Sequence, residues 1–117
     1  MTDPSRQVVL TPHFVRVVKR LRKKYPRVAE TVQGLIEILT QGETPGDQIQ
    51  GVGYTAYKVR LPNPDAQKGK SSGYRVVYYI KKLDRIILLV IYAKTEQVDI
   101  TSEEIRQLID EFEQHSE

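Results

Sequence analysis

The sequence has no cysteine, only two histidines and no long hydrophobic run. Without cysteine, disulfides and thiolate metal sites are excluded. The apolar runs are too short to cross a bilayer, and the first ten residues, MTDPSRQVVL, lack the basic start and long apolar stretch of a secretory signal. We therefore expect a cytoplasmic protein with no membrane partner.

Acidic residues are scarce over most of the chain. Residues 1–95 contain 17 basic and 7 acidic side chains, a net charge of +10, whereas residues 96–117 contain 1 basic and 8 acidic, a net charge of −7. With 39% apolar and 28% charged residues, the composition is that of one globular domain spanning 1–117. The basic body predicts a polyanionic partner, because each phosphate that Lys or Arg neutralises releases condensed counterions.

The first part of the chain predicts a short strand and two helices. Gln7–Leu10 has the composition of a strand, and the Thr-Pro pair that follows suits a helix N-cap with proline at the first helical position. Apolar residues then recur at helical spacing up to Tyr25, and again between Pro26 and Gly42. Helices joined this closely are expected to pack as a hairpin.

After a loop from Gly42 to Gly53, the hydrophobic pattern changes from helical spacing to alternation. This change predicts three strands, Tyr54–Leu61, Gly73–Ile80 and Arg85–Lys94. In the first two strands one face is apolar, and the other carries cations and a phenol. The third is apolar on both faces through Ile91, which is typical of an interior strand.

The acidic C-terminal tail, residues 96–117, predicts a last helix. Thr101 and Glu104 form a capping-box pattern ahead of apolar residues at helical spacing, so this helix should dock on the body, and folding over the basic face is one way to do so. The predicted class is α+β. A short N-terminal strand and a helical hairpin pack on a mainly antiparallel sheet that ends in a three-strand meander, with a C-terminal helix.

Three stretches of this pattern resemble one known group of proteins. They are YKVRL (Tyr57–Leu61), KGKSSGYRVVYY (Lys68–Tyr79) and IYAK (Ile91–Lys94). Together with the order of the predicted elements, from Val8 to Glu104, they make the chain resemble the RelE/ParE toxin superfamily, with the HigB-like or RelE-like branch nearest.

This resemblance implies a toxin of a type II toxin–antitoxin pair. Such a toxin enters the ribosomal A site and cuts the bound mRNA without a metal or other cofactor, leaving a 2′,3′-cyclic phosphate and a 5′-hydroxyl. Its partners would be mRNA, the ribosome and a cognate helix-turn-helix antitoxin encoded by an adjacent gene.

Cleavage of RNA by its own 2′-hydroxyl requires a base, positive charge at the phosphate and an acid for the leaving 5′-oxygen. Histidine is the usual acid or base, but His13 opens a helix and His115 lies in a last helical turn, away from the meander. If the protein cleaves RNA, its acid and base must therefore be lysine, tyrosine or a phosphate held by arginine. Because neighbouring cations favour neutral lysine and ionised tyrosine, we expect a carboxylate-poor pocket that lowers the pKa values of both.

Strand alternation suggests which side chains meet in this pocket. Lys58 and Arg60 share a parity on their strand, and Tyr92 and Lys94 do so on theirs. We assign Arg60 and Arg75 to the scissile phosphate, with Arg75 or a lysine as the acid. The base is sought among Tyr92, Lys68 and Lys70, and the alternative role of the Tyr92 phenol is to stack on a splayed nucleobase.

Other residues are expected to bind RNA without taking part in the chemistry. On the sheet face these are Lys58, Tyr79 and Lys94. The segment from Pro12 to Arg27 carries seven cations and no acid, which favours contact with 16S rRNA through Arg16, Lys19, Arg20 and Lys23. No metal ligand is assigned.

Two other functions fit part of the pattern. A ParE-like inhibitor of DNA gyrase would share the fold, but the cationic sheet face counts against it. A non-catalytic RNA-binding module would need only the positive charge, and a lysine-rich hairpin loop is most often a solvated turn.

Overall fold

The structure is a computed structural model that describes residues 6–66, 73–82, 84–96 and 99–115. Its elements follow in the order β1 (Gln7–Leu10), α1 (Pro12–Arg22), α2 (Val28–Thr40), β2 (Asp47–Ile49), β3 (Thr55–Leu61), β4 (Tyr74–Lys82), β5 (Arg85–Ala93) and α3 (Ser102–Gln114). The predicted α+β class, helical hairpin, meander and C-terminal helix are confirmed. The strand β2 was not predicted, and it lies within the Gly42–Gly53 segment that was expected to be a loop.

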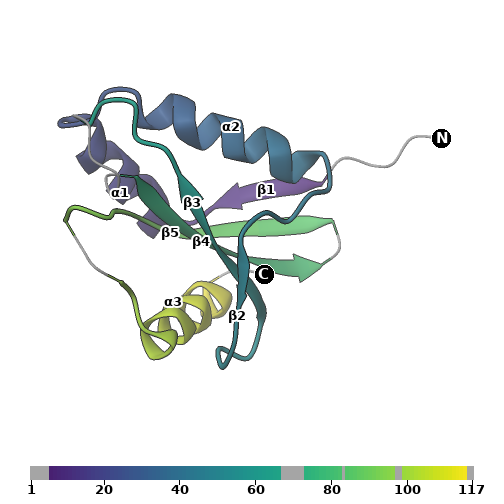
Figure 1. The fold of residues 1–117 in the computed structure, drawn as a ribbon. Helices are drawn as coiled ribbons and strands as arrows, with labels where there is room; N and C mark the ends of the chain where they lie inside the picture. Colours follow the sequence, from purple (N-terminus) through teal and green to yellow (C-terminus); the bar gives the residue numbers. More distant parts are fainter. Residues whose placement is uncertain (1–5, 67–72, 83, 97–98, 116–117) are drawn as a thin grey trace.

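The five strands form one mixed sheet in the order β1-β5-β4-β3-β2. β1 runs parallel to β5, and all other neighbours are antiparallel. Helices α1 and α2 cover one face of this sheet, while α3 lies on the other (Figure 1). Because β5 sits between β1 and β4 with helices on both sides, its two apolar faces are both buried.

The larger core lies between the sheet and the α1–α2 hairpin. Phe14 and Leu21 of α1 and Leu39 of α2 are buried there against Tyr74 and Tyr78 of β4. The Thr11 hydroxyl accepts a hydrogen bond from the backbone N–H of Phe14, so Thr11 caps α1 as the sequence predicts. Burial of this apolar stripe fixes the hairpin on the sheet.

A β-bulge in β5 decides where the last residues of that strand point. Val77 pairs with Val90 whereas Tyr78 pairs with Leu88, so Leu89 is an extra residue between the two pairs. Leu89 and Val90 consequently both pack in the core on the α3 side, and alternation resumes out of phase. With uninterrupted alternation Tyr92 would point towards α1 and α2; the bulge turns it to the face where α3 lies.

Helix α3 docks over one half of its face of the sheet. Ile105 and Ile109 are buried against Val77 and Tyr79 of β4. The predicted capping box is present, since the Thr101 side chain accepts from the Glu104 backbone N–H and the Glu104 carboxylate accepts from the Thr101 N–H. The acidic tail is therefore docked, and it leaves the other half of the face open.

In the described part of the chain, every helix is too short or too polar to span a membrane.

Candidate functional site

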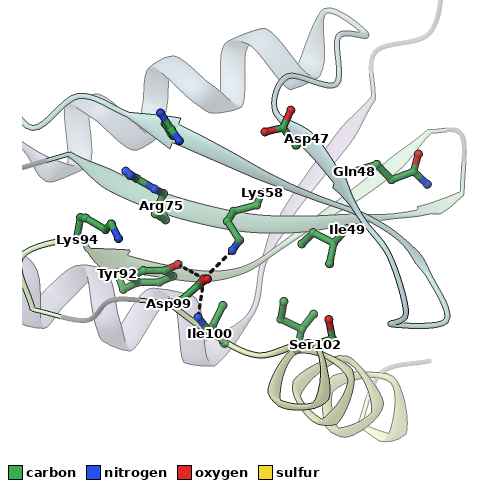
Figure 2. A pocket seen from close by; sticks show the side chains of 12 residues that line it. Asp47, Gln48, Ile49, Lys58, Arg75, Tyr92, Lys94, Asp99, Ile100 and Ser102 are labelled. Carbon is green, nitrogen blue, oxygen red and sulfur yellow. Dashed lines mark hydrogen bonds and ion pairs between the residues drawn. The ribbon is translucent and has the colours of Figure 1, made fainter. Parts of the chain in front are cut away.

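Beside α3, the open half of the sheet face is hollowed into a pocket of about 520 Å³ (Figure 2). Four cationic side chains line it, two from β3, one from β4 and one from the residue after β5, together with a tyrosine from β5 and two carboxylates. These residues are Lys58, Arg60, Arg75, Lys94, Tyr92, Asp47 and Asp99. Three adjacent strands thus bring together Arg60, Arg75 and Tyr92, which were expected to meet in one pocket.

Arg60, Arg75 and Tyr92 form a row across neighbouring strands. Arg60 pairs with Arg75, and Arg75 pairs with Tyr92, in the register of the sheet. Side chains directly opposed in this way have Cβ atoms about 4.5–5.5 Å apart, and opposed like charges destabilise a sheet. Among the described residues neither arginine forms an ion pair with an acidic side chain. The arginine pair is therefore suited to bind an anion from outside the chain.

Asp99 places a carboxylate inside the pocket, which the sequence did not predict. Its Oδ1 accepts hydrogen bonds from Lys58 Nζ at 2.6 Å, from the Tyr92 hydroxyl at 3.1 Å and from the Ile100 backbone N–H at 2.8 Å (Figure 2). With Asp47 also in the lining, the expectation of a carboxylate-poor pocket is wrong. The acids come from β2 and from the segment before α3, elements whose position the sequence does not reveal.

The expected lowering of the tyrosine pKa is wrong for Tyr92. Burial, together with the hydrogen bond to the negatively charged Asp99, raises the pKa of Tyr92 to about 12, and the opposing influence of Arg75 is weaker. The phenol is consequently neutral at physiological pH. It can donate a hydrogen bond, but it is a poor general base.

The contacts of Asp99 lower the pKa of its own carboxyl group. Hydrogen bonds from Lys58, from the Ile100 N–H and from Tyr92 lower the pKa of Asp99 to about 2. A carboxylate with so low a pKa remains ionised throughout the physiological range and has little tendency to take up a proton.

We expect Lys58→Met to raise the pKa of Asp99 from about 2 towards its usual 3.8, because the Lys58 contact is the largest cause of the shift. The depressed pKa means that ionised Asp99 stabilises the fold above pH 4, and that this contribution disappears as the pH falls towards 2. The carboxyl carbon shift of Asp99, followed by NMR against pH, measures the change. Lys82→Met, at the far end of β4, is the matched control and should leave the titration unaltered; an Asp99 that titrates near 3.8 in the unmodified protein would contradict the expectation.

Other predicted RNA-binding residues lie elsewhere. Tyr79 is fully buried (0% exposed), and its hydroxyl donates to Glu113 Oε2 of α3 at 2.5 Å. The expectation that Tyr79 contacts RNA is therefore corrected: the strand parity was right, but α3 covers this part of the face. Lys68 and Lys70, which were predicted as catalytic candidates for the base, lie outside the described residues.

The basic residues of α1 are exposed and lie outside the pocket. Arg20 pairs with Glu96 at 3.3 Å, while its side chain remains 60% exposed. The other predicted contacts, Arg16, Lys19 and Lys23, are also exposed. The helix packs with its apolar stripe on β5, so the basic stripe faces solvent, as its periodicity predicts.

The described residues contain no group of three or more His, Asp or Glu side chains placed to hold a metal ion.

Comparison with known proteins places this chain in a family. The family model described as "RelE toxin of RelE / RelB toxin-antitoxin system" matches residues 7–114. A solved structure of the E. coli toxin RelE, a double arginine-to-alanine mutant in the free state, is similar over 95% of this chain and 97% of that chain, with a TM-score of 0.52 and 16% sequence identity. At this identity the structural likeness supports the fold, and the family match extends over nearly the whole sequence. The chain therefore belongs to the RelE toxin family of toxin–antitoxin systems.

Proposed function

We propose that this toxin is a ribosome-dependent mRNA endonuclease that cleaves mRNA in the A site by attack of the RNA 2′-hydroxyl. The observation that carries the proposal is the opposed pair Arg60 and Arg75 beside Tyr92 in an open pocket. A sheet tolerates such a pair at a cost, and a bound phosphodiester would offset that cost.

The arginines would stabilise the charge that develops during the reaction. As the 2′-oxygen bonds to phosphorus and the bond to the 5′-oxygen breaks, negative charge grows on the phosphoryl oxygens. Guanidinium groups fixed on strands suit this role, because they are planar, always charged and already oriented. In this proposal they supply the positive charge that a metal ion supplies in other nucleases.

Two proton transfers complete the proposed reaction. One removes the proton of the 2′-hydroxyl; because Tyr92 has a raised pKa and Asp99 a low one, we assign this step to Lys68 or Lys70 in its neutral form. The other delivers a proton to the departing 5′-oxygen. We assign it to a lysine ammonium rather than to Arg75, since a guanidinium does not give up its proton. The neutral Tyr92 phenol donates a hydrogen bond to a phosphate of the RNA backbone; its ring is only 4% exposed, so the alternative role of stacking on a base is not proposed.

The partners follow from the same proposal. The exposed basic residues of α1 would bind 16S rRNA, and Lys94 would contact the mRNA backbone at the edge of the pocket. A cognate antitoxin, proposed to be a helix-turn-helix protein, would neutralise the toxin. The site of action would be the cytoplasm, where translating ribosomes are found.

The test is cleavage of a reporter mRNA by the purified chain in a reconstituted translation system. We expect cuts within codons at the A site, only when ribosomes translate, with 5′-hydroxyl ends that require a kinase before ligation. Primer extension locates the ends. Intact messages accompanied by broken DNA in expressing cells would instead indicate a gyrase inhibitor, and intact messages and DNA without growth arrest would indicate a non-catalytic RNA-binding module.

A further inference from the structure

We propose that Lys58 and Tyr92 form a second phosphate subsite, next to the arginine pair, which Asp99 fills when no RNA is bound. The ligand would be the RNA phosphate adjacent to the scissile one. This inference rests on the proposed function for the identity of the ligand, and it concerns a step, exchange of a carboxylate for a phosphate, that precedes any cleavage.

The contacts of Asp99 are those that a phosphate oxygen would make. A single oxygen, Asp99 Oδ1, accepts from Lys58 Nζ at 2.6 Å and from the Tyr92 hydroxyl at 3.1 Å. Charge-assisted hydrogen bonds from an ammonium serve carboxylate and phosphate oxygens alike. An anion therefore already occupies the position, and it is one that belongs to the chain.

The two donors belong to the sheet, whereas the acceptor does not. Lys58 lies within β3, and Tyr92 within β5 is only 4% exposed, so the sheet fixes the backbone of both and the ring of Tyr92. Asp99 lies before α3, outside any helix or strand, and its side chain is 61% exposed. Rotation of that side chain into solvent would free both donors without disturbing the sheet.

The subsite lies where an RNA backbone bound at the arginine pair could also reach it. Lys58 and Arg60 lie on the same face of β3, two residues apart, which corresponds to about 6.4–6.8 Å along a strand. Tyr92 is directly opposite Arg75 in the neighbouring strand. An extended RNA strand crossing the pocket could thus place one phosphate at the arginines and the next at Lys58 and Tyr92.

If a phosphate must displace the Asp99 carboxylate, removal of that carboxylate should change the affinity for RNA, which can be measured without cleavage. The probe is a fluorescently labelled RNA tetranucleotide with 2′-O-methyl groups, which lacks the attacking hydroxyl, and fluorescence anisotropy gives its Kd. Asp99→Asn keeps an oxygen that can accept from the Ile100 N–H but removes the negative charge. We expect it to bind the probe about tenfold more tightly, the scale of one unit charge removed at close range in a partly exposed site.

Glu37→Gln is the matched control, because Glu37 is an exposed carboxylate on α2, outside the pocket, and its removal changes the net charge equally. We expect this variant to bind only slightly more tightly than the unmodified chain. In the double variant Lys58→Met with Asp99→Asn, the tenfold gain should vanish, because the subsite has lost its cation.

Three results would overturn the inference. They are equal or weaker binding by Asp99→Asn, an equal gain in Glu37→Gln, and a gain that survives Lys58→Met. Cleavage is measured separately with unmodified mRNA on ribosomes. If the chain does not cut mRNA but Asp99→Asn binds the probe more tightly in a way that requires Lys58, the nuclease proposal fails and the phosphate subsite stands. If the chain cuts mRNA but Asp99→Asn shows no such gain in affinity, only the subsite is wrong.

Discussion

Arg75→Ala should lower the rate of ribosome-dependent mRNA cleavage by about 10²–10³-fold, the loss that follows removal of one preorganised charge-stabilising group. Arg75 is the central member of the row, paired with Arg60 on one side and Tyr92 on the other. It is therefore the side chain best placed to contact the phosphoryl oxygens as charge grows on them. The measurement is the single-turnover rate of reporter mRNA cleavage on purified programmed ribosomes.

Two variants separate this role from a general effect of charge. Lys82→Ala removes a cation from the exposed far end of the same strand, and it should retain nearly full activity. Arg75→Lys keeps the charge without the planar fork and should recover only part of the loss. If Arg75→Ala cleaves as fast as Lys82→Ala, with both variants folded as judged by circular dichroism, the assignment of Arg75 to the phosphate is wrong.

The sequence predicted the elements because each carries its own local signal. The Thr-Pro start of α1, the capping box of Thr101 and Glu104, and the alternation in β3 and β4 all depend on neighbouring residues alone. The strand β2 escaped prediction because it is only three residues long and lies among glycines. It becomes a strand by pairing with β3, which is a tertiary effect.

The direction of Tyr92 was beyond sequence pattern. β5 is apolar on both faces, so nothing in its residues reveals the extra residue at Leu89 that changes the phase of alternation. The predicted meeting of Tyr92 with Arg75 assumed that the last residues of β5 shared the cationic face, and the bulge is the structural reason that they do. Bulges of this kind are frequent next to active sites, where they re-aim a side chain.

Asp99 and Tyr79 show the other limit of prediction from sequence. Asp99 is far from Lys58 in the chain, and only the docking of α3 brings the segment before it to the pocket. The same docking covers Tyr79. Tyr79 lies on the same face of β4 as Arg75, but α3 buries it. Both errors have one physical cause: the sequence shows that α3 is amphipathic but not which part of the sheet its apolar stripe covers.

Ile109→Ala should lower the free energy of unfolding by about 2–5 kcal/mol, the usual cost of removing a buried isoleucine side chain and leaving a cavity. Ile109 is fully buried (0% exposed) between α3 and the sheet, in the same core as Val77 and Tyr79. Since a domain of this size is stable by only about 5–15 kcal/mol, the loss is a large part of the total. The midpoint of urea unfolding, followed by circular dichroism, measures it.

Gln107→Ala is the matched control, because Gln107 lies on the exposed side of the same helix and should change the stability by no more than about 0.5 kcal/mol. Hydrogen exchange of the α3 amides distinguishes a loosened helix from a globally weaker fold. If α3 alone loses protection in Ile109→Ala, its docking is a separate cooperative unit, and the pocket carboxylate should then be released with it. Equal stability in the two variants would mean that α3 does not pack on the sheet through Ile109, and the account of why half of the cationic face is covered would fail with it.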